Sequence, residues 1–140
     1  MDLLSSVGYA LAYSVVGIVI LAIGYVALDL LTPGRLGDHI MRHGSVNAAV
    51  VAAAGLIGLG LIVFTAIWTN GESSFGHALG YTIVFGLLGV VMQAVAFRLL
   101  DAFTPDDLAA TIMRPEFHPA SIVAAASQVS VSLVIVACIA

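Results

Sequence analysis

The sequence predicts an all-α membrane protein with four transmembrane helices, arranged as two parallel two-helix repeats, each with a short amphipathic cytoplasmic helix. Three observations lead to this fold class: the scarcity of charge, four long uncharged stretches and an internal repeat. Of the 140 residues, 61% are hydrophobic and 9% are charged, whereas about a quarter of the residues of a soluble domain are charged. Because so few charges cannot cover a water-soluble surface, we expect one integral membrane domain over residues 1–140.

The charge balance also excludes several classes of function. The formal net charge is −4 and the four basic residues are dispersed, so a nucleic-acid partner is not expected. A single cysteine excludes a disulfide-stabilised scaffold. The first partner that the composition predicts is the lipid bilayer itself.

Four stretches without Asp, Glu, Arg or Lys are long enough to cross a bilayer, which takes about 20 mostly apolar residues. They are Leu3–Leu28, Gly44–Gly71, Ser73–Phe97 and Phe117–Ala140. Each should be helical, because a segment in lipid must satisfy its own backbone hydrogen bonds. A membrane β-barrel would need alternating apolar and polar positions, and runs such as Val15–Ile23 show no alternation.

The arginines predict how these helices are oriented. Two lie between the first and second stretches, and two lie at or after the end of the third. All four therefore belong to one side of the membrane, which the positive-inside rule makes cytoplasmic. We expect the hairpins at residues 32–44 and 104–117 to be cytoplasmic and both chain termini to lie outside.

The sequence matches itself after a shift of 72 residues. Of the 47 positions from Gly8 to Ala54, 18 are identical to their counterparts without a gap. The polar identities, which chance rarely produces in apolar helices, pair Asp29 with Asp101, Thr32–Pro33 with Thr104–Pro105, and Arg42 with Arg114. The repeat units are residues 1–70 and 73–140. Since each holds two crossings, the units should be parallel, related by an axis along the membrane normal.

Each hairpin contains a threonine followed by proline, which is a helix-start signal. Thr32 and Thr104 are therefore predicted to be N-caps of short amphipathic helices over Pro33–Arg42 and Pro105–Met113. Such helices would lie in the headgroup region with their apolar faces pressed into the membrane; an ordinary polar loop is the alternative. The apolar face of the first consists of Leu36, Ile40 and Met41.

Two ion pairs are predicted to close the hairpins. A carboxylate at a helix C-terminus opposes the helix dipole, so Asp29 and Asp101 need compensation. We expect Asp29 to pair with Arg42 and Asp101 with Arg114, 13 residues further on in each unit. The alternative is that all four side chains extend into cytoplasmic water.

The order of these motifs resembles a known family. A transmembrane helix ending in Asp29-Leu-Leu-Thr-Pro33 is followed by a short polar helix and by Gly44-Ser-Val-Asn-Ala-Ala49, and a weaker copy begins at Asp101. This pattern resembles the bacterial domain-of-unknown-function 350 family over nearly the whole chain. The resemblance implies a small multi-pass protein of the bacterial inner membrane, built from two two-helix units, with no catalytic residues to transfer. Members more commonly have Gly-Asn where this chain has Gly44-Ser45.

The histidines do not form a predicted cofactor site. None of the four falls near the middle of a stretch, so a buried haem is not expected. His39 and His43, spaced i and i+4 with Asp38 beside them, could contribute to a zinc site, but no further ligand completes the set. Surface histidines are the preferred interpretation, and we expect neither a metal nor a cofactor.

Uncharged polar residues inside the apolar stretches are the stronger indication of function. The candidates are Gln93, Ser127, Gln128 and Ser130. Such residues most often form hydrogen bonds between helices, and no carboxylate of the kind that a coupled transporter uses lies in mid-span. We predict a non-catalytic structural or accessory subunit, self-associating or attached to other membrane subunits, with no substrate specified. The alternative is an oligomeric channel or transporter for a small solute or ion, lined by Ser127, Gln128, Ser130 and Ser132 of the fourth helix.

Overall fold

The computed structural model describes residues 2–140, and within that part of the chain every regular element is a helix. Four helices are long and apolar enough to cross a membrane. These are α1 (Leu3–Leu31), α3 (Val46–Thr69), α4 (Phe75–Phe103) and α6 (Ala120–Ile139). The short helices are α2 (Leu36–Met41) and α5 (Leu108–Ile112). An all-α fold with four candidate transmembrane helices, as predicted, is confirmed.

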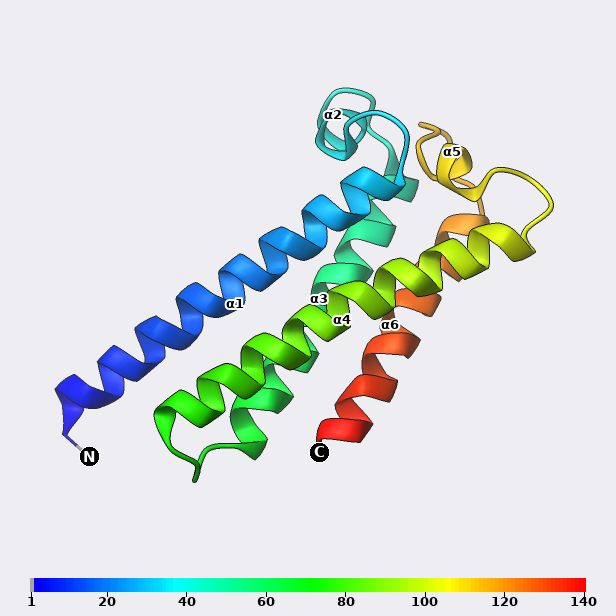
Figure 1. Cartoon of the computed structure of the whole chain (residues 1–140). Helices are drawn as coiled ribbons and strands as arrows, with labels where there is room; N and C mark the ends of the chain where they lie inside the picture. Colours follow the sequence, from blue (N-terminus) through cyan, green and yellow to red (C-terminus); the bar gives the residue numbers. More distant parts are fainter. Residues whose placement is uncertain (1) are drawn as a thin grey trace.

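The long helices form a bundle in which α3 and α4 are central. Helix α3 packs most extensively on α6, and α4 contacts α1, α3 and α6. Figure 1 shows α2 and α5 at one end of the bundle, with the start of α1, the α3–α4 turn and the end of α6 at the other. Both short helices therefore connect their long helices at the same end.

Helix α1 is the least buried of the four spans and α3 the most buried. Small residues explain the burial of α3, because alanine and glycine allow neighbouring backbones to come close in a membrane. Helix α1 instead exposes apolar side chains along most of its length and has one fully buried residue, Ile20. Most of its surface is therefore available to lipid or to another subunit.

Two glycines allow α1 to reach the central helices. A Cβ atom on Gly24 would collide with the side chain of Leu59 on α3, and a Cβ on Gly86 of α4 would collide with Ile20. Each glycine thus provides the recess into which a side chain of the neighbouring helix packs. These two contacts fix the distance of α1 from α3 and α4.

Aromatic rings join α1 to α4 at the end of the bundle that carries the chain termini. The ring of Tyr9 stacks on Phe75 with centroids 4.8 Å apart, and Tyr13 meets the same ring edge-on at 5.6 Å. Such pairs contribute about 0.5–1.5 kcal/mol beyond the area that they bury. They hold the first half of α1, which has few other buried contacts.

The prediction that Thr32 and Thr104 are N-caps is wrong, because each threonine ends the long helix before it. The Thr32 hydroxyl lies 3.1 and 3.2 Å from the carbonyl oxygens of residues 28 and 29, and Thr104 repeats this geometry at 2.8 and 3.0 Å. The hydroxyls thereby satisfy carbonyl groups that a helix C-terminus leaves free. The short helices begin after the prolines, with Arg35 and Asp107 at the N-cap positions.

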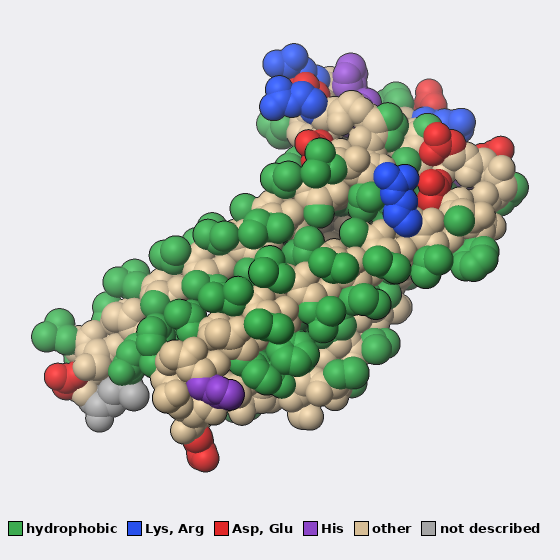
Figure 2. Space-filling model, in the orientation of Figure 1, with side chains coloured by type: hydrophobic (Ala, Val, Ile, Leu, Met, Phe, Trp, Pro, Cys, Tyr) green, Lys and Arg blue, Asp and Glu red, His purple; other side chains and the backbone are tan. Residues whose placement is uncertain are grey.

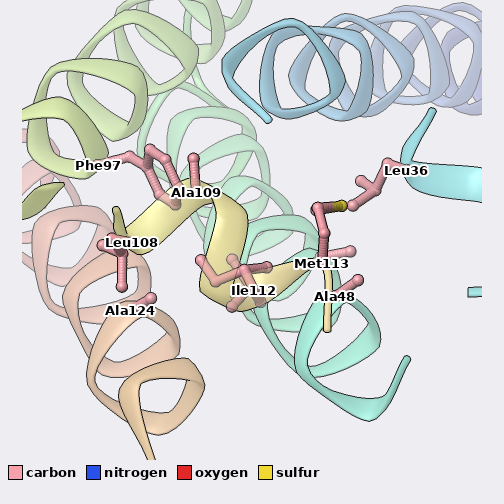
Figure 3. Packing of buried hydrophobic residues seen from close by; sticks show 10 residues of the cluster. Leu36, Ala48, Phe97, Leu108, Ala109, Ile112, Met113 and Ala124 are labelled. Carbon is pink, nitrogen blue, oxygen red and sulfur yellow. The ribbon is translucent and has the colours of Figure 1, made fainter. Parts of the chain in front are cut away.

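The short helices occur where they were predicted but are shorter, and their surroundings differ. In α2, Leu36 is fully buried whereas Met41 is 83% exposed, so the predicted apolar face does not form as one surface. Helix α5 is buried much more deeply. Ile112 and Met113 belong to a core cluster shared with α3, α4 and α6, and Figure 3 shows Met113 directed toward Leu36. The apolar face of α5 therefore packs on protein, and the prediction that it presses into lipid is wrong.

Candidate functional site

Each corner between a long and a short helix is closed by one carboxylate. Asp29 Oδ1 accepts a hydrogen bond from the backbone N–H of Leu36 at 2.6 Å, and Asp101 Oδ1 accepts from that of Leu108 at 2.8 Å. These N–H groups belong to the first residues of α2 and α5, where no intrahelical partner exists. A negative charge is also favoured at a helix N-terminus. One side chain thus links the end of each long helix to the start of the next short one.

The predicted ion pairs Asp29–Arg42 and Asp101–Arg114 are wrong. Among residues 2–140 the one ion pair within 4.0 Å joins Arg42 Nε to Asp38 Oδ1, at 3.7 Å, and both side chains are largely exposed. An exposed pair of this kind contributes about 0–1 kcal/mol. The compensation that the dipole argument requires comes instead from the backbone N–H groups at the start of the short helices.

Ser45, the N-cap of α3, joins the two halves of the chain. Its Oγ accepts from the N–H of Ala48 at 3.2 Å and lies 3.1 and 2.9 Å from the carbonyl oxygens of Ile112 and Arg114. The residue is 1% exposed. A cap that would ordinarily serve only its own helix is therefore shared with the segment that follows α5.

Asn47 lies beside Ser45 and makes a second set of bonds to the same segment. Its Nδ2 donates to the carbonyl oxygens of Arg114 and Glu116 at 3.1 and 2.7 Å, and its Oδ1 accepts from the N–H of His118 at 2.8 Å. The side chain is fully buried. Ser45 and Asn47, the elbow clamp, thus fasten the start of α3 to the link between α5 and α6.

The sequence did not predict the elbow clamp. Both residues stood in the segment that carries the family resemblance, but no role was assigned to them. The available signal was a pair of polar residues at the start of an otherwise apolar helix. The second unit has Phe117 and Pro119 at the equivalent positions, so the clamp has no counterpart in the repeat.

A second cluster, the polar node, lies between α3, α4 and α6 inside the bundle. Gln93 Nε2 donates to the carbonyl oxygen of Gly55 at 3.1 Å and to Ser132 Oγ at 2.8 Å. Gln128 Nε2 donates to the carbonyl oxygen of Gln93 at 3.2 Å, and Ser132 Oγ donates to that of Gln128 at 2.8 Å. The polar node consists of these four residues and joins three spans.

Close approach of α3 and α6 makes the polar node possible. A Cβ atom on Gly58 would collide with the hydroxyl group of Ser132 and would lie 3.0 Å from Gln93 Nε2. Glycine at this position therefore leaves the room that the serine and the glutamine occupy. Interhelical hydrogen bonds of this kind contribute roughly 0.6–2 kcal/mol each in membranes.

The structure brings together two of the four predicted intramembrane polar residues. Gln93 and Gln128 meet in the polar node, whereas Ser127 is half-buried and Ser130 is exposed on the outer surface of α6. Ser132 joins the node because it lies one helical turn after Gln128 and so shares its face. That spacing was visible in the sequence and could have selected Ser132 over Ser127 and Ser130.

The first hairpin's histidines lie side by side. The rings of His39, on α2, and His43, which follows the end of α2, have centroids 5.4 Å apart. Within residues 2–140 no group of three His, Cys, Asp or Glu side chains is placed to hold a metal ion.

Comparison with known sequences agrees with the motifs. The family model described as Domain of Unknown Function (DUF350) matches residues 2–139. The chain belongs to the DUF350 family. A UPF0719 transmembrane protein of Mycolicibacterium paratuberculosis is 37% identical over 109 residues, covering 78% of this chain and 72% of the relative. UPF0719 transmembrane proteins of Mycobacterium bovis and Mycobacterium tuberculosis are 30% identical over 125 residues, covering 89% of this chain and 82% of each relative.

The DUF350 resemblance drawn from the motifs is therefore confirmed. The relatives are named as transmembrane proteins, in agreement with the four apolar helices of this chain. No solved structure matches the chain.

Proposed function

We propose that this DUF350 chain is a non-catalytic structural or accessory subunit of a membrane assembly, either a homo-oligomer or a larger complex. One observation carries the proposal: the buried polar groups of the spans bind one another. Gln93, Gln128 and Ser132 direct their hydrogen bonds at α3, α4 and α6 of the same chain. Polar groups used in this way hold helices together.

The alternative, a channel lined by α6 between several copies, has less support. Such a pore would use the outward face of α6, but Gln128 and Ser132 are buried inside the protomer. Of the polar residues predicted to line it, Ser127 and Ser130 remain toward the outside. Two hydroxyl groups are a sparse lining for a hydrophilic pore.

The outer surface supports association with another subunit. Ser130 is exposed in the middle of α6, where a hydroxyl group gains a hydrogen-bonding partner when a further helix packs against it. Apolar side chains cover the long helices in Figure 2, and α1 is almost entirely unburied. A small protein with this surface is well suited to pack beside other membrane helices.

The proposed orientation places the short helices in the cytoplasm and both chain termini outside, in the bacterial inner membrane. Figure 2 shows the basic side chains gathered at the end that carries α2 and α5. The positive-inside rule assigns that end to the cytoplasm. The equal geometry of the corners at Asp29 and Asp101 supports a pair of parallel repeat units.

Two measurements on protein extracted gently from its native membrane test the proposal. Native mass spectrometry should give a defined multimer or a defined complex with other membrane proteins. Reconstituted liposomes should show no flux of potassium ions, protons or glycerol above that of empty liposomes. A monomer as the sole species would contradict the assembly role, and flux that Ser130→Leu abolishes would favour the channel.

A further inference from the structure

The two glutamine side chains of the polar node have fixed orientations. Gln93 Nε2 and Gln128 Nε2 both donate to backbone carbonyl oxygens, those of Gly55 and of Gln93 itself. A carbonyl oxygen can only accept a hydrogen bond, so the amide groups cannot be turned the other way round. Because the Nε2 atoms make these bonds, each Oε1 atom points away from them.

Both amide oxygens remain without a donor in the part of the chain that the structure describes. The two side chains are 7% and 3% exposed, and no described N–H or O–H group donates to Gln93 Oε1 or Gln128 Oε1. Among the described residues no fully enclosed side-chain oxygen lacks a partner, so both oxygens keep some surface that a water molecule can reach. Two such oxygens in one cluster indicate a ligand that donates to both.

Both oxygens lie within 4.0 Å of one point beside a small cavity. They lie 3.7 and 4.0 Å from the point where a Cβ atom on Gly55 would stand. Gly55, Gln93 and Gln128 line a cavity of about 20 Å³, and Gly24 and Leu28 of α1 cover it. A second cavity of about 10 Å³ shares both glutamines and both α1 residues. The size suits one water molecule, which needs about 10–15 Å³ on this measure.

We propose that the polar node binds one buried water molecule beneath α1. The water donates one hydrogen atom to Gln93 Oε1 and the other to Gln128 Oε1, which satisfies both acceptors. A buried water of this kind requires two to four polar partners, and the two amides provide that minimum. This site is independent of the proposed assembly role.

A cation would fit the same oxygens poorly. The rest of the cavity wall consists of the Tyr25 side chain, whose hydroxyl group lies toward Gly37 of α2, and of apolar residues such as Ala52, Leu56 and Leu59. No charged residue lines the cavity. Two amide oxygens cannot replace the hydration shell of an ion, and an unpaired charge inside a membrane protein is costly. A neutral donor of water size is therefore the ligand that the chemistry selects.

The composition makes the site directly observable, because Gln93 and Gln128 are the only glutamines in the chain. Protein labelled with ¹⁵N at glutamine side chains gives two amide signals in solid-state NMR spectra of bilayer samples. Magnetisation transferred from water should appear on both signals in the wild-type protein. Absence of this transfer from both signals in the wild-type protein would overturn the proposal without any variant.

Gly55→Ala and Gly60→Ala form a matched pair on α3. The alanine methyl at residue 55 meets the glutamine oxygens at ordinary contact distances and fills the space before them, whereas a Cβ on Gly60 meets nothing within 4 Å. Water transfer should fall to background in Gly55→Ala and stay at the wild-type level in Gly60→Ala. Unchanged transfer in Gly55→Ala, with both amide signals still resolved, would overturn the proposal.

Exchange of potassium for sodium or choline at constant ionic strength separates water from a cation. The two amide signals should keep their positions in all three salts. A shift that follows the identity of the cation would show that the oxygens bind an ion, and would overturn the proposal of a water site.

Discussion

At the scale of single residues, the corner aspartates act as acceptors for backbone groups. Replacing Asp29 by alanine removes the acceptor for the Leu36 N–H and should lower the free energy of unfolding by about 1 kcal/mol, as loss of a helix cap does. Asp29→Asn keeps an acceptor oxygen and should cost less. Hydrogen exchange at the Leu36 amide and thermal unfolding in detergent measure both effects.

The control for this prediction is the arginine that was first expected to pair with Asp29. A double-mutant cycle of Asp29→Ala and Arg42→Ala should give additive effects, within about 0.5 kcal/mol, because Arg42 contacts Asp38 instead. A coupling well above that value would restore the ion pair and contradict the corner described here.

Replacing Asn47 should destabilise the protein more than replacing Asp29 or Asp101. Asn47→Ala removes three hydrogen bonds at once and leaves two carbonyl groups and one N–H of the α5–α6 link without this partner. We expect the free energy of unfolding to fall by about 2–3 kcal/mol, the cost of unpaired buried polar groups. Asn70→Ala is the matched control, since Asn70 bonds within its own turn of chain, and should stay within about 0.5 kcal/mol.

Gln93 should be important for the stability of the bundle. Gln93→Leu removes the bonds to Gly55 and Ser132 and should cost about 0.6–2 kcal/mol. Ser130→Ala, on the outer face of α6, serves as the control and should leave the stability of the isolated subunit unchanged. Equal losses in the two variants, measured by reversible unfolding in mixed micelles, would mean that the polar node does not stabilise the bundle.

The sequence indicates which residues are unusual more readily than it indicates their partners. Gln93 and Gln128 are conspicuous because amides are rare in apolar helices, and their structural use was predicted. The partners of Ser45 and Asn47 lie 67 to 71 residues further along the chain, and no local pattern points to them. Thr32 was misassigned because its hydroxyl can bond forward or backward, and only the position of the next helix decides between the two.

At the scale of helices, the attachment of α1 depends on small residues in its neighbours. Gly86→Ala places a methyl group against Ile20, and overpacking of this kind costs about 1–3 kcal/mol. Gly80→Ala on the same helix meets nothing within 4 Å and should instead stabilise α4, by about 0.5–1 kcal/mol. Distance measurements between spin labels on α1 and α4 should show separation in Gly86→Ala alone; an unchanged distance in that variant would contradict the packing.

The ends of the helices were less predictable than their existence. The absence of charge located all four spans, but α4 continues to Phe103, beyond the charged residues Arg98 and Asp101. Charge marks the limit of the hydrocarbon layer and not the end of a helix, because side chains near helix ends can reach the interface. Helix α5 was expected at the membrane surface, yet its burial depends on the space that α3, α4 and α6 leave, which no local pattern reveals.

At the scale of the whole molecule, the two units share their corners but not their connections. The bonds of Asp29 and Asp101 occur 72 residues apart, which is the spacing of the predicted repeat. The elbow clamp lies in the first predicted unit and forms hydrogen bonds to residues 112–118 of the second, so the two units are not interchangeable. The two hairpins are thus joined by one asymmetric contact, at the end where the short helices lie.

The orientation of that end is the central claim, and thiol labelling tests it most directly. Single cysteines are introduced by Arg42→Cys, Arg114→Cys or Glu72→Cys in a Cys138→Ser background. The unaltered protein, which keeps Cys138, provides a fourth labelling site. A membrane-impermeant reagent applied to intact cells should label residues 72 and 138, and should reach residues 42 and 114 only after permeabilisation. Labelling of residues 42 and 114 in intact cells would contradict the orientation, and labelling that places them on opposite sides would contradict the parallel repeat.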